Sequence, residues 1–269
     1  MAAPVIAVAN QKGGVGKTTT AVNLSHGLAR RGHRVLLVDT DTQGQCAKAL
    51  GVETELTITE VLLGEADLLD AVTRARENLD VVAADHHLTR AALAIARRDK
   101  DGHRALAEAL EPARDRYDWV VLDAAPGVDA VAVNVLGCAD DVIAPVALNP
   151  AALAGVMDFV RHVARVGRHN PRLGLRYVLP TFQDLRTRQS GDMLEQLRAH
   201  FGNRLCPPIR VNVELAEAFG YQRTIFEHAP HSRGADDYTG FVDMVEDDRL
   251  TDAYAKVPAE AQEFTLKGA

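Results

Sequence analysis

The sequence predicts a doubly wound α/β fold, in which a mostly parallel β-sheet carries helices on both faces. Strand-like and helix-like stretches alternate along the 269 residues, which is the order that successive βαβ units produce. Several strand-like runs are continuously apolar, as expected for strands that are buried on both faces. A glycine-rich segment, residues 11–19, separates the first apolar run from the first helical pattern, where such folds place a ligand-binding loop.

The individual elements follow from periodicity and from end signals. Strands are predicted at Val5–Ala9, Val35–Asp39, Leu79–Ala83, Trp119–Leu122, Val142–Val146 and Leu175–Leu179, with a further extended piece near Leu205–Val211. Helices are predicted at Thr18–Arg31, Leu88–Arg98, Arg104–Arg114, Ala151–Val166 and Ser190–Phe201. The pattern from Thr57 to Glu60 is a capping box that predicts a helix start, and Gly32 predicts a helix end.

The chain shows no internal repeat, low-complexity linker or composition break. We therefore expect a single domain over residues 1–269, with an acidic tail from about residue 250 as a candidate flexible segment. A hydrophobic content of 47% and a charged content of 25% are ordinary for a soluble globular protein. No apolar run approaches the ~20 residues of a membrane span, and no secretion signal is recognisable. A cytoplasmic protein is expected.

Cysteines and histidines give no metal signal. The three cysteines, Cys46, Cys138 and Cys206, are far apart and contain no Cys-x-x-Cys pair, so they are interpreted as buried structural thiols. The ten histidines show no metal-ligand spacing, and His86–His87 is interpreted as an exposed pair.

Residues 11–19 read Gln-Lys-Gly-Gly-Val-Gly-Lys-Thr-Thr and predict a phosphate-binding loop. Glycines let backbone N–H groups approach phosphate oxygens, and the N-terminus of the following helix favours negative charge. Lys17 is predicted to lie on the β- and γ-phosphates, and the Thr18 hydroxyl on Mg²⁺. The predicted ligands are ATP and Mg²⁺. The predicted nucleotide-binding residues of the loop are Lys12, Gly13, Gly14, Val15, Gly16, Lys17, Thr18 and Thr19.

The second lysine of the loop, Lys12, stands where the general pattern has glycine. The form Lys-Gly-Gly-x-Gly-Lys-Thr resembles the deviant Walker A loop of the ParA/MinD family of P-loop ATPases. The resemblance implies that Lys12 reaches across a homodimer interface to the nucleotide of the partner subunit. A cation supplied in this way stabilises the charge that develops on the transferring phosphoryl group.

Two further motifs place acids at the ends of predicted strands. Asp39 ends one strand and Asp41 follows it, and Asp123 ends another strand. By the resemblance, Asp41 orients or activates the attacking water, and Asp39 lies near the water shell of Mg²⁺. Asp123 holds a metal-bound water together with Thr18. The predicted catalytic set is therefore Lys12, Lys17 and Asp41, and the predicted metal set is Thr18, Asp39 and Asp123.

This chain departs from the family at two of these positions. Thr42 stands where the family usually has proline, and the residues after Asp123 are intermediate between the ParA and MinD patterns. The resemblance covers about residues 4–245. It includes an Arg210-Val211-Asn212 segment where relatives show Pro-Arg-Asn near the adenine, so Asn212 is a further predicted nucleotide contact.

Residues 159–223 carry 11 arginines and 5 acidic residues, although the whole chain has a net charge of −7. A local basic surface of this kind suits weak, sequence-independent contact with DNA phosphates. ParA-like proteins use arginines of the C-terminal half for this purpose, which makes Arg186 and Arg188 the predicted DNA-binding residues.

The resemblance implies an ATPase that forms a homodimer with ATP, associates with the nucleoid by binding DNA non-specifically, and is stimulated by a ParB-like partner or another cargo adaptor. Chromosome or plasmid partition is the leading function. No helix-turn-helix segment precedes the loop, so operator-specific binding is not expected.

Three alternatives remain open. In the first, the cargo is an intracellular body such as a carboxysome or chemosensory cluster. In the second, the chain is a MinD-like membrane switch. In the third, it is a redox ATPase related to nitrogenase iron protein. The residues from Ala255 to Ala269 lack a basic amphipathic face, so no stable membrane association is expected. Cys138 has no evident second cysteine for a bridging cluster.

Overall fold

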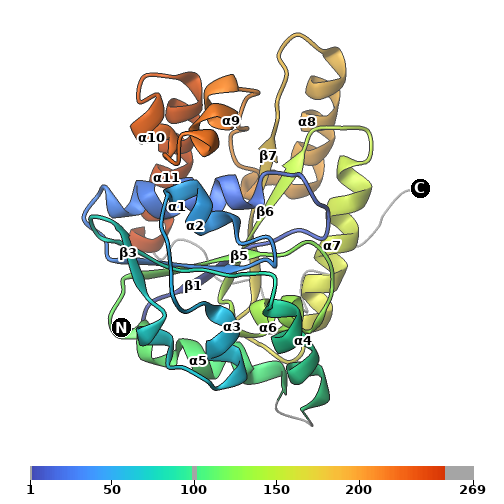
Figure 1. Ribbon diagram of the computed structural model, residues 1–269. Coiled ribbons are helices and arrows are strands. Elements are labelled where there is room, and N and C mark those ends of the chain that lie inside the picture. Colours follow the sequence, from blue (N-terminus) through green and yellow to red (C-terminus); the bar gives the residue numbers. More distant parts are fainter. Residues whose placement is uncertain (1, 99–101, 252–269) are drawn as a thin grey trace.

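A seven-stranded β-sheet forms the centre of the computed structural model, which describes residues 2–98 and 102–251 (Figure 1). The strands lie in the spatial order β3-β4-β2-β5-β1-β6-β7. All neighbouring pairs are parallel except β3 and β4, which pair antiparallel at one edge. The strands are β1 (Val5–Val8), β2 (Val35–Thr40), β3 (Thr73–Arg76), β4 (Leu79–Val82), β5 (Trp119–Ala124), β6 (Asp141–Ala147) and β7 (Gly174–Thr181). The predicted doubly wound, mostly parallel sheet is confirmed.

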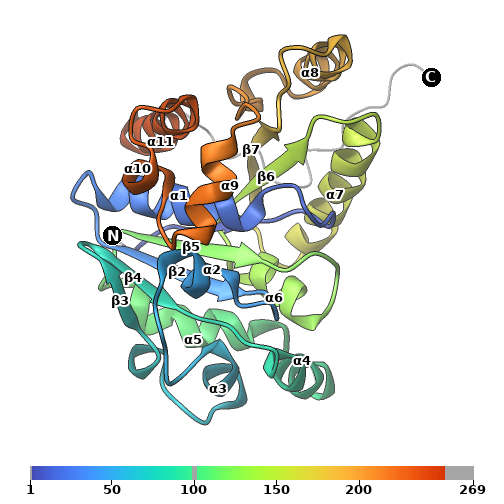
Figure 2. The same cartoon turned by 45° about the horizontal axis from the view of Figure 1, so that its top comes forward.

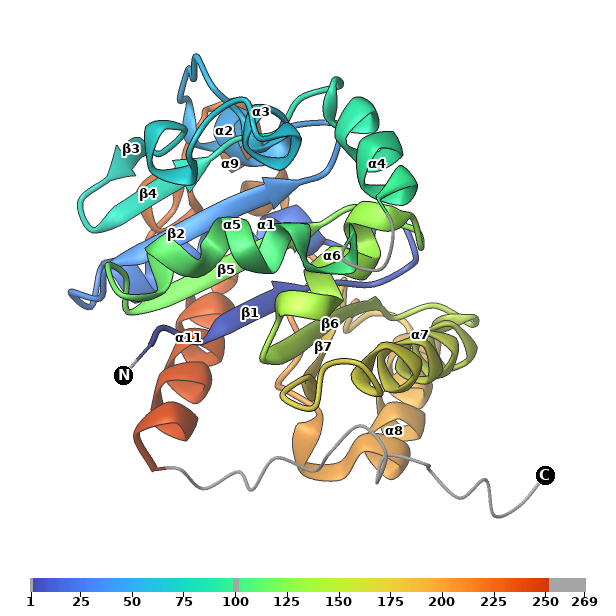
Figure 3. The same ribbon diagram turned by 90° about the horizontal axis from the view of Figure 1, so that it is seen from below.

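Helices cover both faces of the sheet (Figures 1 and 3). The first face carries α3 (Ile58–Leu63), α4 (Leu88–Arg97), α5 (Ala105–Arg114), α6 (Ala130–Cys138) and α7 (Ala152–Gly167), with the end of α8 (Arg188–Phe201). The second face carries α1 (Lys17–Ala29), α2 (Gln45–Leu50), α9 (Val213–Gly220), α10 (Ile225–His228) and α11 (Arg233–Thr251). Figure 2 shows α9 and α10 beside α1 and α2 on this second face.

Strand β1 shows why its sequence is apolar without alternation. Its four residues are all buried. Val5 and Ala7 belong to the hydrophobic core on one face, whereas Ile6 and Val8 belong to the core on the other. A strand with two buried faces has no solvent side on which polar residues would be stable.

The strand register brings the carboxyl ends of β1, β2 and β5 together. Asp123 is the register partner of both Val8 and Asp39. The loop after β1 therefore begins beside two acidic side chains, at the edge where open α/β sheets bind ligands.

The predicted helix ends agree with the structure. Thr57 and Glu60 form the predicted capping box at the start of α3, because the Thr57 N–H donates to the Glu60 carboxylate at 2.9 Å. Gly32 has a positive φ of 90° and lies just beyond α1, which ends at Ala29.

Several elements were not predicted, and each has a physical reason. Helix α6 is rich in valine, which reads as strand in isolation, and α2 and α10 are too short for a helical period. Edge strand β3 contains two arginines. The extended piece predicted near Leu205–Val211 forms only isolated bridges to β7 and the residues after it, and contains Pro207 and Pro208.

The single-domain expectation for residues 1–269 stays a prediction. The acidic tail expected from about residue 250 lies almost entirely outside the described residues.

Candidate nucleotide and magnesium site

The phosphate loop connects β1 to α1 and has the backbone shape that its glycines predict. Gly14 and Gly16 have φ angles of +69° and +88°, which favour glycine, and Gly16 is the N-cap of α1. A Cβ atom at Gly13 or Gly14 would meet no protein atom within 4 Å. The open space beside these glycines lies at the N-terminus of a 13-residue helix, where a phosphate group is favoured.

Two polar side chains that sequence reasoning missed hold this loop in place. The Asn10 side-chain amide donates to the Pro145 carbonyl at 2.8 Å, and its oxygen accepts from the Lys12 N–H at 3.1 Å. The Thr181 hydroxyl donates to the Val15 carbonyl at 2.9 Å. The loop is therefore fixed to β6 and β7 as well as to its own strand and helix.

Lys17 is buried at the base of the loop, with 6% of its surface exposed. Its ammonium donates to the Lys12 carbonyl at 3.1 Å. Burial lowers its pKa, and the charges of Asp123 and Asp41 only partly oppose that shift. Additional negative charge at the loop, such as that of phosphates, would stabilise the ammonium.

Lys12 differs from Lys17 in both exposure and direction. It is exposed, and its ammonium donates to the side-chain oxygen of Asn149 at 3.3 Å, beyond the end of β6. The two lysines of the loop therefore hold their charges in separate environments, one inside the molecule and one on its surface.

Asp39 and Asp123 lie side by side at the ends of β2 and β5, and both are fully buried. Asp39 accepts hydrogen bonds of 2.9 Å from the N–H groups of Asp41 and Cys46. Burial raises the pKa of Asp39 despite these bonds, with the Asp41 charge adding to the shift. Asp39 is thereby fixed in orientation by backbone donors.

Asp123 is less well satisfied. One of its oxygens accepts from the Cys46 thiol at 3.3 Å, and no described residue donates to the other, Oδ1. Burial and the Asp39 charge raise its pKa, and the nearby Thr18, Cys46 and Lys17 offset this only in part. A buried carboxylate oxygen without a partner is costly unless a cation or water serves it. The oxygen donors of Asp123, Asp39 and Thr18 fit Mg²⁺, a hard cation.

Cys46 was predicted to be a structural thiol, and its burial is confirmed. The structure adds that it touches both site carboxylates, with which it forms a three-residue cluster. Its position seven residues after Asp39, at the start of α2, is visible in the sequence but carries no recognised motif. Cys138 lies in the hydrophobic core of the first face, as predicted, and burial raises its pKa to about 12.

Asp41 lies beyond β2, partly exposed, in a turn where its carboxylate accepts from the Gln43 N–H at 3.0 Å. It lines a cavity of about 510 Å³ together with residues of α4 and of the loop after β5. Leu88, Thr89 and Pro126 are among the other lining residues.

The segment singled out as a nucleotide contact in the C-terminal part of the chain, residues 210–212, directly precedes α9. Asn212 caps α9, because its side-chain oxygen accepts from the Leu215 N–H at 3.0 Å. Arg210 is held by an ion pair with Asp237 on α11. Asn212 as an adenine contact stays a prediction.

Arg186 and Arg188 are exposed near the start of α8. Arg186 forms an ion pair with Asp184 at 2.8 Å, whereas no ion pair from the described residues is recorded for Arg188. At least six of the 11 arginines in residues 159–223 form ion pairs with residues that the structure describes: Arg161, Arg172, Arg176, Arg186, Arg198 and Arg210. The positive charge of this region is therefore partly neutralised within the protein.

Within residues 2–98 and 102–251, no helix combines the length and the apolar composition needed to cross a membrane. The segment from Ala255 to Ala269, on which the comparison with MinD depends, lies outside the described residues.

Comparisons with known proteins agree with this geometry. A family model described as "AAA domain" matches residues 3–175. The chromosome-partitioning ATPase Soj of Thermus thermophilus is 41% identical over 242 residues, which cover 89% of this chain and 94% of that protein. The chromosome partitioning protein ParA of Caulobacter vibrioides is 39% identical over 226 residues, covering 80% and 84%.

Among solved structures, cobyrinic acid a,c-diamide synthase from Mycobacterium smegmatis, with a bound ATP analogue and magnesium, is 32% identical with a TM-score of 0.81. The match covers 93% of this chain and 97% of that chain. The fold and the matched relatives are thus those of a nucleotide-binding P-loop ATPase. The chain is 37–41% identical to ParA and Soj proteins over 80–89% of its length, and it therefore belongs to the ParA/Soj family of chromosome-partitioning ATPases.

Proposed function

We propose that this chain is an ATP-dependent dimerising switch that binds DNA without sequence preference and hydrolyses ATP to segregate a chromosome or plasmid. The observation that carries the proposal is the loop with two lysines, one buried and one exposed, beside Asp39 and Asp123. Curated relatives with 37–41% identity are named for chromosome partitioning or as Soj. They favour partition over the amide synthesis named for the 32% identical structure.

In the proposed ATP complex, the N–H groups of residues 13–19 bind the phosphates, and Lys17 lies on the β- and γ-phosphates. Thr18 and Asp123 hold Mg²⁺ directly or through water, and Asp39 orients its water shell. Mg²⁺, when bound, neutralises charge on the phosphate oxygens. The Oδ1 atom of Asp123, to which no described residue donates a hydrogen bond, supports this assignment.

Hydrolysis is proposed to depend on Asp41 and Lys12. Asp41 lines the cavity at the carboxyl edge of the sheet, where it would position the attacking water. Lys12 is exposed on the loop, and in a homodimer it would reach the nucleotide of the partner subunit. Its weak contact with Asn149 leaves the ammonium able to change partner.

We propose that DNA binds the surface around Arg186 and Arg188 through its phosphates, and that a ParB-like protein or another adaptor stimulates hydrolysis. Arg188 is the stronger candidate, because Arg186 already pairs with Asp184. Binding through phosphates gives affinity without sequence reading and would place the ATP-bound protein on the nucleoid.

The experiment that tests this function measures binding to random-sequence duplex DNA with ATP, with ADP and without nucleotide, at one stated salt concentration. Binding only with ATP is expected. Binding that is independent of nucleotide contradicts the switch. No binding in any state, combined with ATP-dependent binding to anionic liposomes, would favour a membrane switch instead.

Matched variants separate the roles. Asp41→Ala is expected to bind ATP and DNA and to accumulate as a dimer without hydrolysing, whereas Lys12→Ala should bind ATP but lose hydrolysis. Arg188→Ala should weaken DNA binding and reduce its salt dependence, and Arg186→Ala should do so less. Hydrolysis at the wild-type rate by Asp41→Ala would remove that residue from the mechanism.

A further inference from the structure

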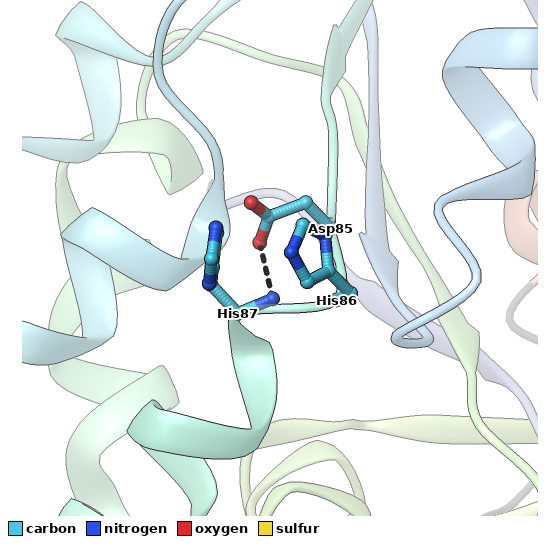
Figure 4. A group of neighbouring side chains, drawn as sticks. All are labelled: Asp85, His86 and His87. Carbon is cyan, nitrogen blue, oxygen red and sulfur yellow. Dashed lines mark hydrogen bonds between the residues drawn. The ribbon is translucent and has the colours of Figure 1, made fainter.

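A second cluster of metal-ligating side chains lies outside the nucleotide site, in the loop between β4 and α4. Its members are the successive residues Asp85, His86 and His87 (Figure 4). One ligand atom from each lies within 4.8 Å of the others. Figure 4 shows the three side chains grouped together in this loop. The pair of histidines is exposed, as the sequence analysis expected, but it has a carboxylate partner that residue spacing alone did not reveal.

The Asp85 carboxylate is already oriented. Its Oδ1 accepts from the Thr59 hydroxyl at 2.8 Å and from the His87 N–H at 3.2 Å. Both bonds end on the same oxygen, and no hydrogen bond or ion pair from the described residues is recorded at Oδ2. An oriented carboxylate with one oxygen in use is the arrangement that supports metal ligation.

The two imidazoles supply nitrogen donors at the same place. Their ring centroids are 3.8 Å apart, with an angle of 40° between the planes. Both rings are exposed, so side-chain rotation can bring the donors from their present spread to the ~3.4 Å that separates two ligands of one tetrahedral ion with metal–nitrogen bonds of about 2.1 Å.

We propose that Asp85, His86 and His87 bind one divalent transition-metal ion of the Zn²⁺ type. Two imidazoles and one carboxylate are a donor set that such ions use, and Mg²⁺ disfavours it because it prefers oxygen ligands. The exposed side of the cluster leaves the remaining coordination positions to water.

The proposed site is separate from the Mg²⁺ site but close to its supporting loop. A Cβ on Gly44, which follows the Asp41 turn, would lie 2.3 Å from the Ala84 carbonyl. The backbone just before Asp85 is therefore packed against the segment that carries Asp41. Leu88, directly after His87, lines the same cavity as Asp41.

The test is a titration of the full chain, stripped of metal and kept in excess Mg²⁺, with Zn²⁺ followed by calorimetry and with Co²⁺ followed by its visible absorption. One ion per chain is expected. His86→Ala and His87→Ala should each weaken binding by about tenfold or more. His200→Ala, which removes another exposed histidine on α8, is the matched control and should leave binding unchanged.

Melting temperature provides a second readout. Without metal, the His86→Ala and His87→Ala proteins should melt as the wild type does, because both rings are exposed. Zn²⁺ should raise the melting temperature of the wild type and of His200→Ala but not of these two variants. Equal Zn²⁺ affinity in the wild type and both variants would overturn the proposal. So would a thiolate-to-cobalt absorption band, which would place the ion at Cys46, or the absence of binding.

Discussion

Buried aspartates at the two ends of the parallel strands differ in how completely their carboxylates are hydrogen-bonded and ion-paired. At the amino end, the Asp140 side chain is 6% exposed and has three partners: it accepts from the Val5 N–H at 2.9 Å and from Arg114 at 2.8 Å, and it pairs with Arg172 at 3.3 Å. At the carboxyl end, Asp123 is fully buried, and its Oδ1 has no described donor.

The contrast separates a structural role for a buried aspartate from a proposed ligand-binding role. Asp140 connects the starts of β1 and β6 to α5, and its charge is compensated inside the protein. At the ligand-binding edge the charge of Asp123 is offset only in part, by Thr18, Cys46 and Lys17. Burial of a carboxylate with an unserved oxygen is unfavourable, which is consistent with the proposed Mg²⁺ site at this end of the sheet.

The strongest test of the contrast at the carboxyl end is Lys17→Ala. Removing the buried ammonium should reduce ATP affinity by on the order of 100-fold or more and abolish hydrolysis. Stability should change little, because among the described residues the ammonium donates a hydrogen bond to the Lys12 carbonyl alone. Calorimetric titration with ATP and thermal melting measure the two effects. ATP affinity close to that of the wild type would contradict the assigned role.

At the amino end, Arg114→Ala should do the reverse. It removes a nearly buried partner of Asp140 and should destabilise the protein by about 3 kcal/mol, while ATP affinity is retained. Arg172→Ala is the matched control: this arginine is 59% exposed, so its loss should cost about 1 kcal/mol or less. Urea unfolding of both variants checks this. An equal loss of unfolding free energy in the two variants would show that the buried ion pair stabilises the protein no more than the exposed one.

Asp123→Asn sharpens the comparison further. Burial raises the pKa of Asp123, so at about pH 5 the folded protein holds this carboxyl protonated. Replacing it by the neutral amide should then change the free energy of unfolding in the absence of Mg²⁺ by no more than about 1 kcal/mol. Mg²⁺-dependent ATP hydrolysis should be lost. Urea unfolding with a chelator and ATPase assays with varied Mg²⁺ measure both. A loss as large as that of Arg114→Ala would mean that Asp123 is structural.

A further expected effect is a pH dependence of stability at the carboxyl edge. Burial raises the pKa of Asp39 and Asp123 in the folded protein, whereas the unfolded chain has the ordinary pKa of about 4. Between these values the folded state binds more protons than the unfolded state. In a chelator, stability should therefore fall as the pH rises above about 4, by about 1.4 kcal/mol for each unit of pKa difference.

This dependence is measured as a difference. Urea unfolding at about pH 5 and pH 8 should show a larger decrease for the wild type than for Asp123→Asn, and added Mg²⁺ should reduce that difference. A decrease of the same size in both proteins would assign the pH dependence to other groups.

The sequence predicted the parts of the molecule that depend on local pattern. Six strands follow from short apolar runs, and the phosphate loop follows from residues 11–19. Asp39 and Asp123 were predictable as strand-end acids, because parallel strands that end together bring their ends to one edge.

Contacts between distant residues were not predictable from the same patterns. Asn10 and Thr181 hold the loop through partners 135 and 166 residues away. The Cys46 thiol meets Asp123 across 77 residues. The orientation of the loop residue Asp85 depends on Thr59, which lies in α3. Such side chains have no periodicity of their own, since their role arises only when the sheet and helices are packed.

The hydrogen bond from Thr181 to Val15 connects the nucleotide loop to the segment proposed to bind DNA, so the two ligands can affect the binding of each other. Thr181 is the last residue of β7, and the segment that leads to Arg188 begins at the next residue. The strand that holds the nucleotide loop is thus the base of the proposed DNA-binding segment. If ATP tightens DNA binding through this connection, thermodynamic reciprocity requires DNA to tighten ATP binding by the same factor. A protein on the nucleoid would then be saturated at a lower ATP concentration than the same protein free in solution.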